Sequence, residues 1–99
     1  MAVIVFRNRL DDRHLNEYGL TAVRMLELVQ SMPGFVSFKA FNAEDGERLA
    51  LVEFESEEAA AAWGRHPEHL EAQRLGRETF YTAFTLQVCE VLRQSDFER

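Results

Sequence analysis

The sequence predicts an α+β domain with a ferredoxin-like β-α-β-β-α-β order, in which helices cover one face of an antiparallel sheet. Two periodicities support this prediction. Segments of alternating apolar residues, typical of strands, are separated by two regions in which apolar residues recur at helical spacing. The length of 99 residues fits a single domain over residues 1–99, and neither repeats nor low-complexity linkers divide it.

The first third of the chain carries one strand and one helix. Ala2–Leu10 is rich in β-branched and aromatic residues, which favours a strand. Asp11 and Asp12 can cap the following helix, whose apolar residues recur at helical spacing from Leu15 to Met32. Pro33-Gly34 then ends that helix.

A hairpin is expected next. Phe35–Asn42 predicts the second strand, with Phe38 on one face and Phe35 on the other. The turn Glu44-Asp45-Gly46 leads to a third strand over Arg48–Glu55.

The last third is expected to hold two helical segments and a long strand. Ser56 is a good N-cap for a helix that reaches Trp63, and Pro67 starts a short helix that ends with Gly76 as its C-cap. Thr79–Leu92 predicts the final strand, with Phe80 and Phe84 on one face and Tyr81 on the other; the polar tail is Ser95–Arg99.

Composition excludes several classes of partner. A net charge of −6 argues against nucleic acid, and no apolar run is long enough to span a membrane. The lone Cys89 cannot form an intrachain disulfide, which favours a reducing cytoplasm. One sheet face carries no helix yet is partly apolar, so we expect a homodimer in which two sheets pack face to face.

Four segments together resemble the antibiotic biosynthesis monooxygenase domain of the dimeric α+β barrel superfamily: Met32–Phe35, Leu51–Ser56, Ala61–Arg77 and Phe80–Val91. The spacing Trp-x-x-His-Pro-x-His-x-x-x-Gln-x-x-Gly-Arg within the third segment is the most specific part of the resemblance. The family includes cofactor-free oxygenases of polycyclic aromatic phenols, haem-degrading monooxygenases and signal-related binders. The scaffold alone therefore does not decide the chemistry.

The resemblance implies a monooxygenase that acts on a small aromatic or quinol-like substrate without a cofactor. One alternative is a non-catalytic dimer that binds small molecules. Another is haem degradation with an altered ligand set, since Asn8 and Trp63 match that branch but Gln73 stands where its proximal His would be. An amide is a poor iron ligand compared with imidazole. Nucleotide-binding fingerprints are absent, so neither flavin nor nicotinamide is expected.

Three residues are the candidate catalytic groups. His69 is the expected base because imidazole titrates near neutral pH, and its alternative role is a lining residue bonded to backbone. Asn8 would orient a substrate hydroxyl or O2, or else bond to backbone at the strand end. Trp63 would line the pocket with its indole N–H as a donor, or belong to the core.

The expected substrate pocket is a flat apolar cavity for an aromatic ligand. Its predicted lining residues are Phe6, Phe38, Phe54, His66, Gln73 and Phe84.

Other polar residues have competing interpretations. His66 and His69 could pair at a metal, but no third ligand is evident, so no metal is predicted; His66 could instead cap the helix at Pro67. Arg74 and Arg77, with Tyr81, could hold an anionic group or form ion pairs with neighbouring glutamates.

Overall fold

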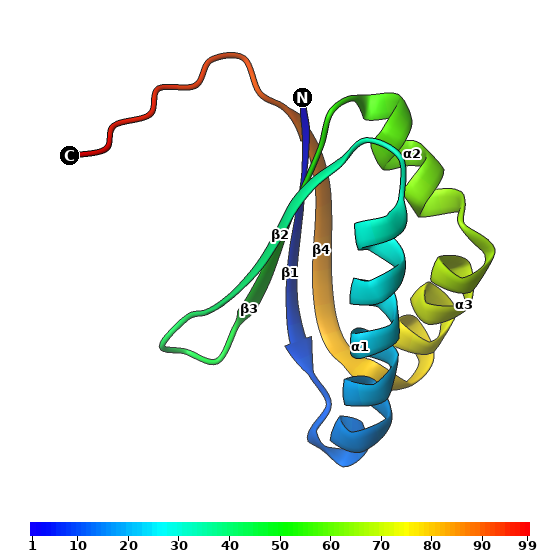
Figure 1. Cartoon of the computed structure of the whole chain (residues 1–99). Coiled ribbons are helices and arrows are strands. Elements are labelled where there is room, and N and C mark those ends of the chain that lie inside the picture. The colour runs from blue at the N-terminus through cyan, green and yellow to red at the C-terminus, as the bar shows by residue number, and fades with distance from the viewer.

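A four-stranded antiparallel sheet carries three α-helices on one face in the computed structural model of the chain, which describes residues 1–99 (Figure 1). The strand order is β2-β3-β1-β4. The elements are β1 (Ala2–Leu10), α1 (Leu15–Ser31), β2 (Phe35–Asn42), β3 (Arg48–Phe54), α2 (Glu57–Arg65), α3 (Pro67–Leu75) and β4 (Tyr81–Glu90). The predicted ferredoxin-like α+β fold is confirmed.

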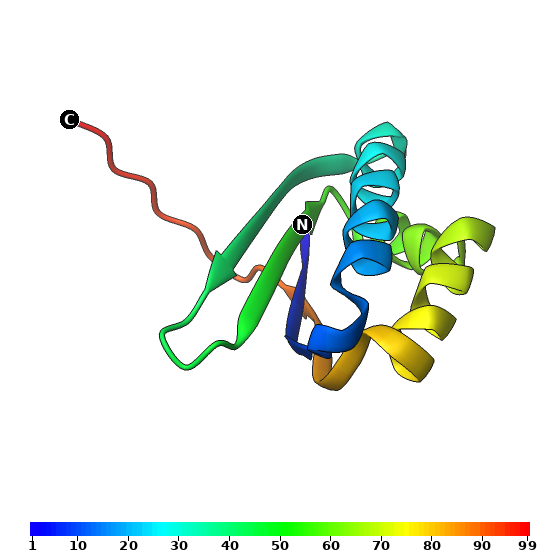
Figure 2. The same cartoon turned by 90° about the horizontal axis from the view of Figure 1, so that it is seen from below.

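Two short turns complete the element list. A 3-10 turn at Asp12–His14 precedes α1, and a π-helical turn at Gly76–Phe80 joins α3 to β4. Figure 2 shows all three helices on the same side of the twisted sheet, with the opposite face uncovered. None of these helices combines the length and hydropathy that a membrane span requires.

The strand register arranges the helix-facing side chains in rows across the sheet. Because alternate residues of a strand point to the same face, paired residues line up from strand to strand. The rows that matter for the site are Phe38–Val52–Ile4–Val88, Ala40–Ala50–Phe6–Leu86 and Arg48–Asn8–Phe84.

The closely packed core lies at one end of this face. Phe54 is completely buried there, and Val29 of α1 and Trp63 of α2 pack into the same cluster. Only 10 of the 99 residues are buried, so much of the helix-facing surface is not filled by the core. That unfilled space becomes the site described below.

Two β-bulges change the faces that strict alternation predicts. The register of β2 shifts between Phe35 and Ser37, which brings Phe35 onto the helix side against Phe54 at 6.0 Å between ring centroids. The register of β1 with β4 shifts at Leu10, which brings Tyr81 onto the helix side. The predictions that both rings face away from Phe38 and Phe84 are wrong, because a bulge adds one residue and reverses the faces beyond it.

The helix ends follow the predicted capping residues except at the start of α1. Asp11 accepts from the Arg13 N–H at 3.0 Å and so caps the 3-10 turn before α1, and no side chain caps α1 itself. The Ser56 hydroxyl accepts from the Ala59 N–H at 3.1 Å, as expected of an N-cap. Gly76 is the C-cap of α3, as predicted; its φ is −58°, and the chain continues into the π-helical turn. Glycine is needed there because a Cβ would lie 2.8 Å from the Tyr81 ring.

Gly34 is the glycine whose replacement should disturb the fold most, since its φ is +81° and a Cβ would lie 2.7 Å from Ala59 Cβ. We expect Gly34→Ala to lower the free energy of unfolding by at least about 1–3 kcal/mol, measured by urea denaturation. Gly19→Ala is the matched control: a Cβ there meets nothing within 4 Å. It should raise stability by about 0.5–1 kcal/mol, and an equal loss from both variants would contradict this account.

Candidate functional site

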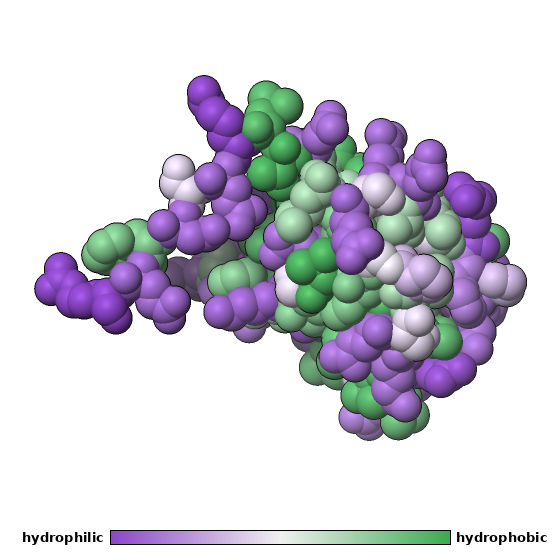
Figure 3. Space-filling model, turned by 45° about the horizontal axis from the view of Figure 1, so that its top comes forward, coloured by the Kyte–Doolittle hydropathy of each residue, from purple (hydrophilic) through white to green (hydrophobic).

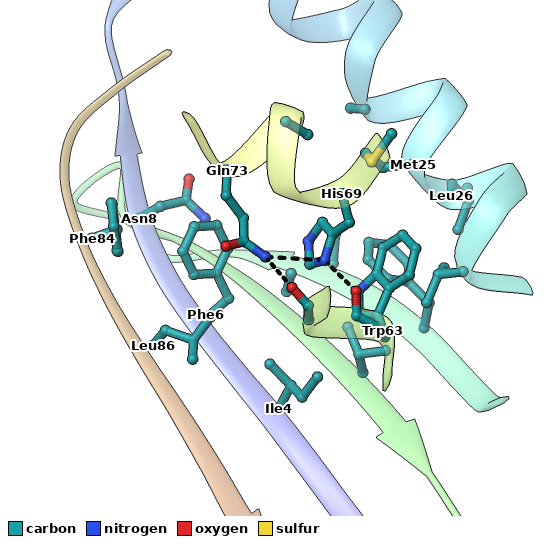
Figure 4. A pocket seen from close by; sticks show the side chains of 18 of the residues that line it. Ile4, Phe6, Asn8, Met25, Leu26, Trp63, His69, Gln73, Phe84 and Leu86 are labelled. Carbon is teal, nitrogen blue, oxygen red and sulfur yellow. Dashed lines mark hydrogen bonds between the residues drawn. The ribbon is translucent and has the colours of Figure 1, made fainter. Parts of the chain in front are cut away.

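A cavity of about 520 Å³ lies between the helix-facing side of the sheet and the three helices (Figure 4). Of its 29 lining residues, 21 are hydrophobic, and the size is that of a small-molecule site. The floor is low at its centre because Ala40 and Ala50 sit there instead of larger side chains. Phe38 on β2 is 38% exposed and Leu86 on β4 is 54% exposed, so the cavity opens toward the sheet edges.

His69 projects from α3 into this cavity and lies flat against Trp63. The two ring centroids are 4.0 Å apart and the planes differ by 12°, a stacked arrangement. His69 Nδ1 is 2.9 Å from the carbonyl oxygen of Trp63. The stacking contact therefore holds the face of the imidazole ring, and the contact with the carbonyl oxygen holds its edge.

The break between α2 and α3 makes this contact possible. In an uninterrupted helix the carbonyl of Trp63 would accept from residue 67, but Pro67 has no N–H. The next carbonyl, that of Gly64, would accept from Glu68, whose N–H instead donates to the ring of His66 at 3.2 Å. The Trp63 carbonyl still accepts from the His66 N–H at 3.1 Å. Each of the two carbonyls also accepts from a side chain of α3.

These side chains are His69 and Gln73. The Gln73 Nε2 donates to the Gly64 carbonyl at 3.1 Å and lies 3.2 Å from His69 Nδ1. Because a carbonyl oxygen only accepts, the 2.9 Å contact to Trp63 requires a hydrogen on Nδ1. His69 is therefore assigned as the Nδ1–H tautomer, which leaves a lone pair on Nε2, and no protein group bonds to that nitrogen.

The environment keeps this imidazole neutral. Burial lowers the pKa of His69, the nearby His66 lowers it slightly further, and the hydrogen bond to the Trp63 carbonyl acts in the opposite direction. A neutral ring with a free Nε2 lone pair is the form that accepts a proton. The predicted alternative, in which His69 is a lining residue bonded to backbone, agrees with the contact between Nδ1 and the Trp63 carbonyl. The role of His69 as a base stays a prediction.

Asn8 lies on β1, across the cavity from His69 (Figure 4). It is 5% exposed, and its Oδ1 is buried without a hydrogen-bond partner. The alternative prediction, a bond from this side chain to backbone, is wrong. A buried amide oxygen without a donor from the protein costs free energy, so a hydrogen-bond donor brought into the cavity would be stabilised there.

Polar groups surround Asn8 at this end of the cavity. Arg48 is its cross-strand neighbour on β3, and the guanidinium carbon lies 5.0 Å from the ring centroid of Tyr18 on α1. Tyr81 closes the end, 5.3 Å from Phe6 between centroids. Burial raises the pKa of the Tyr81 hydroxyl, and the nearby Tyr18 raises it further, so Tyr81 stays a neutral donor.

Most of the predicted pocket residues line the cavity, but two do not. Phe6, Phe38, Gln73 and Phe84 are lining residues, as are Asn8, Trp63 and His69. Phe54 lies on the correct face but at the packed end of the sheet, where it is fully buried in the core.

His66 is the second correction to the predicted lining. Its Nδ1 accepts from the Glu68 N–H, so it caps α3 at Pro67, as the competing interpretation predicted. No group of three or more His, Cys, Asp or Glu side chains is arranged to hold a metal ion.

The arginines near the C-terminal end of α3 separate into two roles. Arg74 forms ion pairs with Glu71 and Glu78, whereas Arg77 lines the cavity. Arg48 and Tyr18 also line the cavity but were not among the residues predicted from the sequence. A signal for Arg48 was present, since alternation along β3 places it on the face of Ala50 and Val52.

The donor set does not fit haem in the arrangement that the resemblance suggested. Gln73 stands at the position of the proximal His, and its amide nitrogen is bonded to the Gly64 carbonyl. A neutral amide offers no strong ligand to iron.

Comparisons with known proteins agree on the family and the fold. The family model described as antibiotic biosynthesis monooxygenase matches residues 1–75. The uncharacterized Bacillus subtilis protein YqjZ is 33% identical over 81 residues, which are 82% of this chain and 71% of YqjZ.

Two solved structures illustrate the shared fold at low identity. A proposed antibiotic biosynthesis monooxygenase from Deinococcus radiodurans has a TM-score of 0.85 at 11% identity, with both chains covered completely. SnoaB from Streptomyces nogalater, a cofactor-independent oxygenase solved as a point mutant, has a TM-score of 0.78 at 15% identity over 94% of each chain.

The unpartnered amide of Asn8 has a measurable consequence for stability. We expect Asn8→Leu to raise the free energy of unfolding by about 1–2 kcal/mol, because an apolar side chain of similar size removes a buried acceptor that lacks a donor. Gln73→Leu is the matched control and should lower it by about 1 kcal/mol, since the Gly64 carbonyl loses its donor. If Asn8→Leu destabilises as much as Gln73→Leu in urea denaturation, Asn8 has a partner in the free protein.

Proposed function

The chain belongs to the antibiotic biosynthesis monooxygenase family, and from this membership and the site geometry we propose that it oxygenates a small aromatic or quinol-like molecule without a cofactor. The observation that carries the proposal is the neutral His69, whose free Nε2 lines an apolar cavity opposite the unpartnered amide of Asn8. A base and an orienting amide on opposite walls suit a flat phenol lying between them.

The proposed reaction addresses the slow reaction of O2 with closed-shell molecules. His69 Nε2 takes the phenolic proton, and the resulting electron-rich anion transfers one electron to O2. The two radicals combine into a carbon–oxygen bond, the proton held by His69 passes to the peroxide, and loss of water leaves a carbonyl. For 1-naphthol the products are 1,4-naphthoquinone and water, so the substrate supplies every electron and no external reductant is needed.

The remaining lining residues would prepare the substrate for this step. The apolar floor excludes water and so strengthens the interactions made by the few polar groups. Asn8 would accept from or donate to a substrate oxygen. The Trp63 indole N–H forms no hydrogen bond within the protein, which leaves it available as a donor while the ring fixes the plane of His69.

A homodimer through the sheet faces is part of the same proposal. The face without helices carries Val5 and Leu51 on its central strands and Phe41, 41% exposed, toward its edge. Beyond β4 the chain extends away from the body as a mostly hydrophilic segment with apolar groups (Figure 3). Leu92 and Phe97 on it are 87% and 85% exposed. Apolar surface of this kind favours packing against a second copy.

Oxygen uptake tests the proposed function. With a panel of naphthols, naphthalene diols and anthrones, we expect protein-dependent O2 consumption above the spontaneous rate, with one labelled atom from 18O2 in the product. His69→Ala should lower kcat by about 100-fold or more because the base is lost. The native rate should fall on the acidic side of a pKa below the ordinary imidazole value, since protonated His69 cannot accept a proton.

His14→Ala is the control, since His14 lies outside the cavity lining, and its rate should match the native protein. Turnover that survives His69→Ala would refute the assignment of the base. Ligand-dependent thermal shifts without O2 consumption by any panel member would instead identify a non-catalytic binding protein.

A further inference from the structure

We propose that the end of the cavity formed by Arg48 and Asn8 binds a carboxylate and an adjacent hydroxyl, so that the ligand is an aromatic hydroxy acid. This inference rests on the proposed function for identifying the ligand as substrate, but its binding test does not require turnover. The observation behind it is a pair of neighbouring polar side chains on the cavity floor, neither of which has a hydrogen-bond partner in the protein.

Arg48 is held in place while its hydrogen-bonding edge stays free. It is only partly exposed, and its guanidinium lies over the Tyr18 ring at 5.0 Å from the centroid. Stacking on a ring uses the face of the guanidinium and leaves its N–H groups in the plane available. A planar group with two acceptor oxygens matches that fork, and a carboxylate is such a group.

The chain does not supply this carboxylate itself. It has 17 acidic residues, and five arginines form ion pairs with them: Arg7, Arg9, Arg13, Arg24 and Arg74. Arg48 is in none of these pairs. The one acidic lining residue is Glu57, which follows the opposite end of β3, about 20 Å away along the strand.

Asn8 supplies an independent observation that points to a ligand. It pairs with Arg48 across the strands, so their side chains leave the sheet side by side on the cavity face. Its Oδ1 is a buried acceptor without a donor. A carboxylate would satisfy Arg48 but not this oxygen, whereas a hydroxyl on the next ring carbon would donate to it.

The rest of the cavity fits the aromatic body of such a ligand. Phe6 and the two alanines of the same row continue the floor away from Asn8 toward Ile4 and Val52. Arg77 also lines the cavity and is exposed, which adds positive charge where the ligand enters. The ligand's ring would then lie beneath His69, and the hydroxyl next to the carboxylate would lie at the polar end. In a substrate, the hydroxyl that gives its proton to His69 would be a second one, on the part of the ring that lies beneath His69.

A pair of ligands that differ only in charge tests the inference by isothermal titration calorimetry. The acid is 1-hydroxy-2-naphthoate and its neutral counterpart is 1-hydroxy-2-naphthamide. The native protein should bind the acid at least about tenfold more tightly than the amide. Arg48→Met should reduce that ratio to within about twofold with little change for the amide, and Arg48→Lys should retain part of it.

Arg65→Met is the matched control, since Arg65 is unpaired but lies outside the cavity, and it should keep the native ratio. Equal binding of the two ligands, a ratio that survives Arg48→Met, or no binding of either ligand up to millimolar concentration would each overturn the inference. If one of these binding outcomes occurs but neutral phenols support O2 uptake, the proposed function would still stand. If the native protein prefers the acid and Arg48→Met loses that preference, but no phenol supports O2 uptake, the proposed function would be rejected and the binding inference would stand.

Discussion

The clamp on the His69 ring is the interaction on which the account of this site depends. It depends on Pro67, which has no N–H to give the Trp63 carbonyl its usual helical partner. That carbonyl accepts from the His66 N–H and from His69 Nδ1. The stacked indole fixes the ring plane, and the same hydrogen bond fixes the tautomer. A single helix break therefore determines which nitrogen is basic and where its lone pair lies.

The sheet makes room for chemistry by packing its core at one end. Phe54 and its neighbours fill the space between sheet and helices, while Ala40 and Ala50 leave the middle of the floor open. This arrangement costs folding free energy at Asn8, where a buried amide oxygen has no hydrogen-bond donor. A ligand with a hydrogen-bond donor at this point would remove that cost.

Regular elements were predictable from sequence because each depends on local pattern or local chemistry. Ser56 and Pro67 mark helix starts whatever the rest of the chain does. The orientations of Phe35 and Tyr81 were not predictable by alternation, since bulges depend on the pairing strand. Alternation also predicts which face of the sheet Phe54 occupies. It does not predict the position of Phe54 along the strand, and that position decides whether the side chain lies in the core or lines the cavity.

The most direct test of the central claim is the tautomer and pKa of His69, measured by long-range ¹H–¹⁵N NMR during a pH titration, with His69→Gln used to assign the signals. The clamp predicts a hydrogen on Nδ1, and the burial of the ring predicts a pKa below the ordinary value of about 6.5, so the ring stays a neutral base through neutral pH. A hydrogen on Nε2, or a raised pKa, would contradict the account, because the nitrogen facing the cavity would then be a donor.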